Sequence, residues 1–144
     1  MEDQTFQLKP LQKVHLKEMV SLDSICFSKE DAYPFELMDY FFSRPKSFAI
    51  GYFFGNKLIA FILCIKNEIV TIDVHPEFQN KGLGKNLLKY AIFKIKKKGY
   101  KNVTLQVDEN NAKALKLYEK FGFEIVEKYK ANHKLRYYMS LKLC

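Results

Sequence analysis

The chain has 144 residues, a length typical of one domain with a sizeable core. Apolar residues make up 48% of it and four are proline, which favours a folded globule over a disordered segment. Its net charge of +8, from 24 basic and 16 acidic residues, invites a nucleic-acid-binding interpretation. However, the lysines are spread along the chain, and the densest run, Lys94 with Lys96 to Lys98, closes a predicted helix, where cations complement the dipole. The charge equally suits capture of a polyanionic cofactor.

Membrane insertion, disulfides and metal binding are not expected from this composition. No apolar run approaches the ~20 residues of a membrane span, and the first residues, Met-Glu-Asp-Gln, lack the basic and apolar regions of a signal peptide. The three histidines form no pair at metal-ligand spacing, so no metal site is expected. The cysteines, Cys26, Cys64 and Cys144, are odd in number and widely spaced, which favours free thiols in a reducing cytoplasm.

The first half of the chain predicts a strand, two helices and three more strands. Apolar residues recur at helical spacing in two segments, the second of which stops near Pro45. Gly55-Asn56 is a hairpin signal between two strand-like runs, and Lys66-Asn67 is a tight connection to a third. We therefore expect strand 6–8, helices 11–27 and 35–42, and strands 47–54, 57–66 and 68–75.

The second half predicts helix 82–99, strand 102–107, helix 111–121, and strands 124–129 and 136–143. The strand–helix–strand unit in its middle should be a right-handed parallel crossover after the antiparallel meander. We therefore expect an α/β (α+β) fold in a single domain, residues 1–144, with a mixed, mainly antiparallel sheet, helices on both faces and one β-α-β crossover. Where the two parallel strands diverge, their carboxyl ends, Asp73-Val74 and Val107-Asp108, should leave a crevice for a ligand.

The segment from Gln79 to Lys85 leads from a hydrophobic strand into the long helix. A glycine turn at a helix N-terminus presents free N–H groups and the positive end of the dipole, a place that binds phosphate. Gly82 and Gly84 lack a Cβ, so a pyrophosphate could approach the main chain closely, and Lys81 and Lys85 add charge. The pattern lacks the Ser or Thr of a P-loop and the third glycine of a dinucleotide fingerprint. The alternative is an ordinary strand-to-helix turn.

A second constellation begins at Asn111, which can cap the helix 111–121. Ala114, Leu115 and Tyr118 follow it at i+3, i+4 and i+7, so all four residues share one helix face. Tyr118 should lie about 10 Å along the axis from Asn111. That span suits a polar anchor for an extended arm with a phenol near its tip. The alternative is that Tyr118 is a core aromatic residue.

Together, Gln79-x-x-Gly82-x-Gly84 and Asn111-x-x-Ala114-x-x-x-Tyr118 resemble the two best-marked segments of the GNAT N-acetyltransferase superfamily, in the same order and spacing. The resemblance covers nearly the whole chain and implies acetyl-CoA as the cofactor. It implies that the pyrophosphate lies on the N–H groups of residues 79–85, and that the pantetheine arm pairs with residues 72–74 and reaches towards Asn111. The implied cofactor-binding residues are Ile72, Asp73, Val74, Gln79, Asn80, Lys81, Gly82, Leu83, Gly84, Lys85, Asn111 and Tyr118.

The segment Cys26-Phe27, followed by Tyr33-Pro34-Phe35, resembles the substrate loop of protein N-terminal acetyltransferases, including those of ribosomal proteins. This likeness implies that a peptide N-terminus enters between residues 33–36 and a loop over 130–135. The alternative is a helix-entry loop with aromatic packing. The implied substrate-binding residues are Tyr33, Pro34, Phe35, Glu36, Gln106 and Tyr129.

Acetyl transfer from a thioester to an amine needs a neutral amine, a polarised carbonyl and a protonated leaving thiolate. Tyr118 matches the family's usual general acid, and a backbone N–H near Val74 would polarise the carbonyl. The base stays open, because this chain has Gln106 where the bacterial ribosomal-protein enzymes carry a glutamate. Glu68 matches a position where other members place a catalytic side chain and would act through a water. Glu36 is a second candidate.

The resemblance thus implies an acetyl-CoA-dependent N-acetyltransferase that acts by direct attack of a primary amine, with a protein or peptide N-terminal α-amine preferred. The alternatives are a small-molecule amine acetyltransferase, a non-catalytic acyl-CoA-binding module and a basic nucleic-acid-binding domain. Gln106, and Lys130 where the peptide-acetylating subgroup often has tyrosine, weaken the assignment of the acceptor and not that of the cofactor. Monomer and homodimer both stay open.

Overall fold

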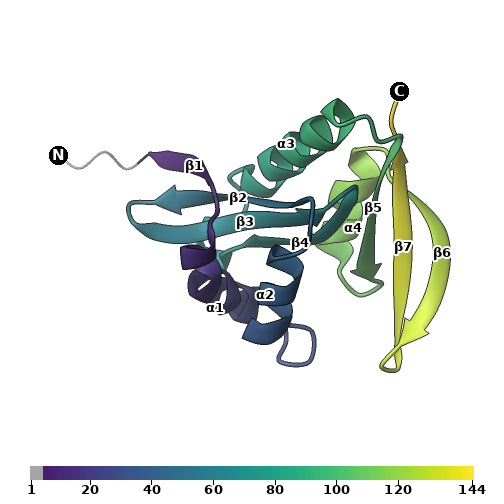
Figure 1. Ribbon diagram of the computed structural model, residues 1–144. Coiled ribbons are helices and arrows are strands. Elements are labelled where there is room, and N and C mark those ends of the chain that lie inside the picture. The colour runs from purple at the N-terminus through teal and green to yellow at the C-terminus, as the bar shows by residue number, and fades with distance from the viewer. Residues whose placement is uncertain (1–4) are drawn as a thin grey trace.

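The computed structural model describes residues 5–144 (Figure 1). Met1 to Gln4, in which no signal peptide was expected, lie outside the described residues. The fold class is confirmed: helices cover both faces of a mixed sheet. The helices are α1 (Leu16–Cys26), α2 (Phe35–Phe42), α3 (Leu83–Lys97) and α4 (Ala112–Lys120), with short 3-10 turns at Lys13–His15 and Pro76–Phe78. The strands are β1 (Phe6–Pro10), β2 (Ser47–Phe54), β3 (Lys57–Ile65), β4 (Glu68–Val74), β5 (Asn102–Asp108), β6 (Glu124–Ala131) and β7 (Lys134–Lys142).

The sheet has the strand order β1-β2-β3-β4-β5-β7-β6 and is antiparallel except between β4 and β5. That parallel pairing covers two residue pairs, Glu68 with Thr104 and Ile69 with Leu105. Beyond it the strands diverge, as predicted for the two ends of the crossover. On its β5 side, the backbone of β4 from residue 70 to 74 therefore faces a gap in the sheet, where a ligand can reach main-chain groups, while its other edge stays paired with β3.

Two hydrophobic cores lie on opposite faces of this sheet. On one face, α3 and α4 pack on the sheet, while α1 and α2 cover the other face (Figure 1). Strand β3 serves both cores because successive side chains point to opposite faces: Ile62 faces α3, and Phe61 and Leu63 face α1. A register shift between β3 and β4 leaves Val70 as an extra residue, a β-bulge beside the gap.

The first predicted helix, 11–27, is wrong at its N-terminal end. Residues 13–15 form a 3-10 turn instead, in which His15 Nδ1 accepts a hydrogen bond from the Gln12 N–H at 2.8 Å, and α1 begins only at Leu16. Val14, an apolar residue within the predicted range, is 77% exposed. The local side-chain cap therefore outweighs the helical spacing of the apolar residues.

The predicted loop over 130–135 is also wrong. Strands β6 and β7 continue until two residues remain between them, Asn132 and His133. Both have positive φ, 52° and 65°, as a tight hairpin turn requires, and Asn and His tolerate that region better than most residues. The hairpin is therefore a long, paired arm that reaches the open side of the sheet gap.

Candidate active site

Two adjoining cavities open at the gap between β4 and β5. The larger has a volume of about 790 Å³ and the smaller about 340 Å³. The same side chains form the boundary between them, which we call the junction: Cys26, Phe27, Ile72, Asn111, Ala114 and Tyr118. The site thus has two compartments that meet beside the phenol of Tyr118.

The smaller cavity lies between the end of β4, the start of α3 and the face of α4. Of the predicted cofactor-binding residues, Asp73 and Lys81 do not line it. The Asp73 side chain points to the other face of the sheet, where it is buried against α1. The other ten do line it: Ile72, Val74, Gln79, Asn80, Gly82, Leu83, Gly84, Lys85, Asn111 and Tyr118.

Gly82 is the N-cap of α3 and adopts the left-handed conformation, with φ of 80°. No side chain caps this helix, and its first intrahelical bond runs from the Asn86 N–H to the Gly82 carbonyl. The N–H groups of residues 83–85 therefore have no partner within the helix and carry the positive end of its dipole. Because these residues line the smaller cavity, its α3 end can hold an anionic group.

Lys113 and Gln79 join the two sides of the smaller cavity. Lys113 Nζ donates to Gln79 Oε1 at 2.9 Å, and Gln79 Nε2 donates to the Val74 carbonyl at 3.3 Å. Lys113 was not predicted from the sequence, although it lies in the first turn of the helix that Asn111 opens. Lys85 was selected because it lies at the start of α3. The same reasoning at the start of α4 points to Lys113. Lys85 and Lys113 thus place two positive charges around the cavity.

Asn111 and Tyr118 lie on the face of α4 that forms the junction, as the i, i+7 spacing predicted. Asn111 is the N-cap: its Oδ1 accepts from the Ala114 N–H at 3.2 Å, and its amide NH₂ remains for a ligand. Tyr118 is buried, with its ring 5.7 Å from that of Phe123. Burial and then the nearby Asp73 raise the pKa of Tyr118 above its usual value, so the phenol keeps its proton at neutral pH.

The larger cavity lies between the loop that precedes α2, strand β5 and the β6–β7 hairpin. Four of the predicted substrate-binding residues line it, namely Tyr33, Pro34, Gln106 and Tyr129, while Phe35 and Glu36 do not. Glu68 does not line it either. The Gln106 amide lies between Glu68 and the cavity. Its Nε2 donates to Glu68 Oε2 at 3.3 Å, and its Oε1 accepts from the Tyr129 hydroxyl.

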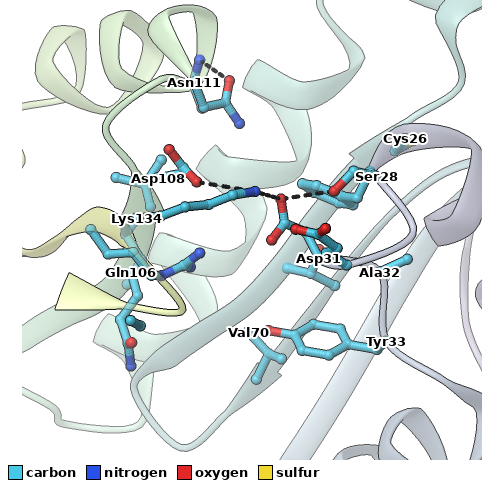
Figure 2. Close-up of a pocket in the computed structure, with 18 of the residues that line it drawn as sticks. Cys26, Ser28, Asp31, Ala32, Tyr33, Val70, Gln106, Asp108, Asn111 and Lys134 are labelled. Carbon is cyan, nitrogen blue, oxygen red and sulfur yellow. Dashed lines mark hydrogen bonds and ion pairs between the residues drawn. The ribbon is translucent and has the colours of Figure 1, made fainter.

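An ion pair closes one side of the larger cavity. Lys134 Nζ, at the start of β7, lies 3.0 Å from Asp31 Oδ2 in the loop before α2 and 4.0 Å from Asp108 Oδ2 at the end of β5 (Figure 2). The hydrogen bond from Lys134 lowers the pKa of Asp31. Neither Asp31 nor Lys134 was predicted from the sequence, because nothing local to either residue indicates a contact between positions so far apart in the chain.

Helices that could cross a membrane are absent from residues 5–144. In the same range, no three His, Cys, Asp or Glu side chains gather in a way that could hold a metal ion.

Comparison with known proteins identifies the family. Residues 16–123 match the acetyltransferase (GNAT) family, which is most of the chain. The chain belongs to this family, and the resemblance drawn from the sequence is confirmed.

Among its relatives is the [ribosomal protein bS18]-alanine N-acetyltransferase of Haemophilus influenzae, 40% identical over 77 residues. That match takes in 51% of this chain and 52% of the relative, so the chain spans about half the length of the curated relative it matches.

Solved structures share the fold. The ribosomal-protein-S18-alanine N-acetyltransferase from Escherichia coli superposes with a TM-score of 0.83 at 21% identity, covering 96% of this chain and 94% of that one. A chain of the NatC complex bound to Gag peptide and CoA superposes with a TM-score of 0.80 at 21% identity, covering 96% and 99%. At this level of identity the likeness concerns the fold.

Proposed function

We propose that this protein is an acetyl-CoA-dependent N-acetyltransferase whose acceptor is the α-amine of a protein or peptide N-terminus. The observation that carries the proposal is the junction beside Tyr118, where a compartment suited to a phosphate-bearing arm meets a second, larger compartment that opens to solvent. Transfer between two substrates requires such a meeting point, because the reacting atoms must approach to about 3–3.5 Å.

The smaller cavity fits acetyl-CoA in chemistry and in shape. The free N–H groups of residues 83–85, with Lys85 and Lys113, would hold the pyrophosphate. The stretch of β4 that has no partner on its β5 side would hold the amides of the pantetheine arm, and the Asn111 NH₂ would donate to it. When bound, the thioester supplies an activated acetyl group. Asp73 would contribute through its backbone alone, since its side chain faces α1.

Tyr118 is the proposed general acid. Its phenol is protonated at neutral pH and lies at the junction, so it would donate its proton to the leaving sulfur. A backbone N–H of β4 near Val74 would polarise the acetyl carbonyl. The acceptor amine must lose a proton before it attacks, and Glu68 would take that proton through a water, while Gln106, itself held by Tyr129, orients the Glu68 carboxylate. Neither carboxylate lines the cavity, but Glu68 is hydrogen-bonded to Gln106, which does, so Glu68 is preferred to Glu36.

A peptide acceptor is preferred over a small amine because of the size of the larger cavity. Its volume of about 790 Å³ is more than twice the 340 Å³ of the smaller cavity, so it has room for several residues of an extended main chain. The relative from Haemophilus influenzae is named for acetylation of a ribosomal protein's alanine. The three cysteines are free thiols, which suits a cytoplasmic enzyme.

The proposal is tested by measuring CoA release with a library of peptides that vary in their first residue, run beside polyamines and aminoglycosides. We expect turnover with a subset of the peptides and little with the small amines. Turnover confined to small amines would overturn the choice of acceptor. Binding of acetyl-CoA, seen as a thermal shift, without transfer to any of these compounds would indicate an acyl-CoA-binding module instead.

A further inference from the structure

Arginine is rare in this chain. Among the 24 basic residues two are arginine, Arg44 and Arg136, and the rest are lysine. Arg44 is exposed, with its guanidinium 4.3 Å from the ring centre of Tyr40. Arg136 is partly buried and lines the larger cavity. A guanidinium binds a carboxylate through two parallel N–H···O bonds, which an ammonium cannot do, so the position of this one residue matters.

Arg136 lies on β7, where its neighbours across the sheet are Asp108 on β5 and Tyr129 on β6. All three line the larger cavity. Burial raises the pKa of Tyr33 and the charge of Arg136 opposes that rise, so the guanidinium also lies near the phenol on the opposite wall. Arg136 thus faces the space between the hairpin and the loop that precedes α2.

Asp31 and Asp108, which line this space, and Glu68 beside it are already engaged with other groups, whereas Glu30 lines it without a hydrogen bond or ion pair to another described residue. Lys134, the other cation that lines the cavity, is the partner of two of them. Within the described part of the chain, Arg136 forms no ion pair at or below 4.0 Å. The existing pairs are Asp31 with Lys134 and the Ser28 hydroxyl, Asp108 with Lys134 and the Asn110 N–H, and Glu68 with the Gln106 amide. The guanidinium is therefore available to a carboxylate that comes from outside.

We infer that Arg136 binds an acidic side chain within the first three residues of the acceptor, so that the enzyme prefers acidic N-terminal sequences. This inference rests on the proposed function. The acceptor amine must reach the junction, and Arg136 lines the larger cavity but not the smaller one. The arginine therefore meets the residues that follow the amine. An extended chain advances about 3.3–3.6 Å per residue, so three residues span roughly 10 Å of the cavity.

The test uses peptides that begin with alanine and carry one glutamate at position two, three or six, each paired with the glutamine version. We expect kcat/KM to be about tenfold higher for glutamate at position two or three than for glutamine, as a charge-assisted pair predicts. Glutamate at position six should give a ratio near one. Added salt should lower the ratio at the favoured position, because the contact is between opposite charges near solvent.

Arg136→Gln should reduce the glutamate-to-glutamine ratio to about one, and Arg136→Lys should keep part of it. Arg44→Gln removes the other arginine and should keep the full ratio. Thermal melting of each variant confirms that it is folded. A ratio near one in the wild-type enzyme, or one that survives Arg136→Gln, would overturn the inference while leaving the acetyltransferase proposal intact. Absence of transfer to every peptide would overturn both.

Discussion

The carboxyl groups of Asp23 and Asp73 face each other between α1 and β4, and both residues are wholly buried. Asp23 Oδ2 accepts from the Tyr33 N–H at 2.7 Å, and Asp73 Oδ1 accepts from the Thr71 hydroxyl at 2.6 Å. The two remaining oxygens have no other partner in the described residues. Burial and then Asp23 raise the pKa of Asp73 well above its usual value. The raised pKa favours a proton shared between the two carboxyl groups, and the pair fastens the loop before α2 to the strand of the active site.

This pair should make stability depend on pH. Above about pH 4 the folded protein still holds a proton at Asp73 that the unfolded chain has released. The contribution of this proton to stability is therefore complete below about pH 4 and is lost as pH rises towards the raised pKa. Asp73→Asn keeps a hydrogen-bond donor and cannot ionise. Each pKa unit is worth about 1.4 kcal/mol, or about 4 °C in Tm. We expect the melting temperature of the variant to rise relative to that of the wild type as pH increases above about 5.

Differential scanning fluorimetry across this range provides the measurement, with Glu36→Gln as the control because Glu36 is an exposed acid away from the pair. Parallel curves for the wild type and Asp73→Asn would show that Asp73 is ionised in the folded protein and would contradict the shared proton.

Gly82 and Gly99 allow strain and ligand binding to be separated. Both have positive φ, 80° and 94°, one before and one after α3, and a Cβ added to either has no heavy atom within 4 Å. Alanine at either position should therefore cost about 1–2 kcal/mol of stability through backbone strain alone. Gly82 lines the smaller cavity and Gly99 does not. We expect Gly82→Ala, but not Gly99→Ala, to weaken CoA binding about tenfold in isothermal titration calorimetry. Equal affinities would argue against a pyrophosphate at this helix start.

Tyr118→Phe should lower kcat about 100-fold, since proton donation by a positioned side chain contributes about that much. The phenylalanine ring keeps the contact with Phe123, so the melting temperature and the Kd for acetyl-CoA should change little. The raised pKa of Tyr118 also predicts that the wild-type rate does not fall through loss of this proton below about pH 10. Unchanged turnover in the variant, measured by CoA release, would remove Tyr118 from the acid role.

Position 106, now Gln106, is where an added carboxylate would contribute most to deprotonating the acceptor amine. It lines the larger cavity and its amide donates to Glu68, so Gln106→Glu would bring two carboxylates together and raise the pKa of one of them. A base with a raised pKa operates closer to neutral pH, so we expect kcat to rise several-fold near pH 7. The pH–rate profile of Glu68→Gln should lose its acidic limb, whereas that of Glu36→Gln should not. If all three profiles match the wild type, Glu68 is not the base.

Cys26 should be unreactive although it lines both cavities. Burial, and then the charge of Asp73, raise the pKa of its thiol to about 12. At pH 8 that leaves about one molecule in ten thousand as the thiolate, the form that reacts. Iodoacetamide should therefore modify the exposed Cys144 first, as peptide mass spectrometry would reveal. Labelling of Cys26 as fast as Cys144 would contradict this environment.

Most of the fold was predictable because its determinants are local. Hydrophobic periodicity, the Gly55 turn and the start of α3 each depend on a few neighbouring residues, and every predicted helix and strand is present. The errors have local causes too: a side-chain cap at His15 shortens the first helix, and a left-handed Asn132-His133 pair lengthens the hairpin.

The larger cavity was less predictable because tertiary contacts create it. Asp31 and Lys134 meet only because the loop before α2 and the hairpin cover the same gap in the sheet. The Asp23 and Asp73 pair likewise depends on how α1 packs on β4. By contrast, the starts of α3 and α4 form much of the smaller cavity. The free N–H groups of a helix start depend on the local sequence alone, so they could be predicted.

The most direct test of the proposed activity is to find where the acetyl group goes. The purified protein is incubated with acetyl-CoA and a peptide that has a free N-terminus and an internal lysine, and the product is sequenced by tandem mass spectrometry. We predict acetylation of the α-amine, at a rate that Tyr118→Phe lowers about 100-fold. Acetylation of the lysine alone, or no product from a protein that binds acetyl-CoA, would contradict the account.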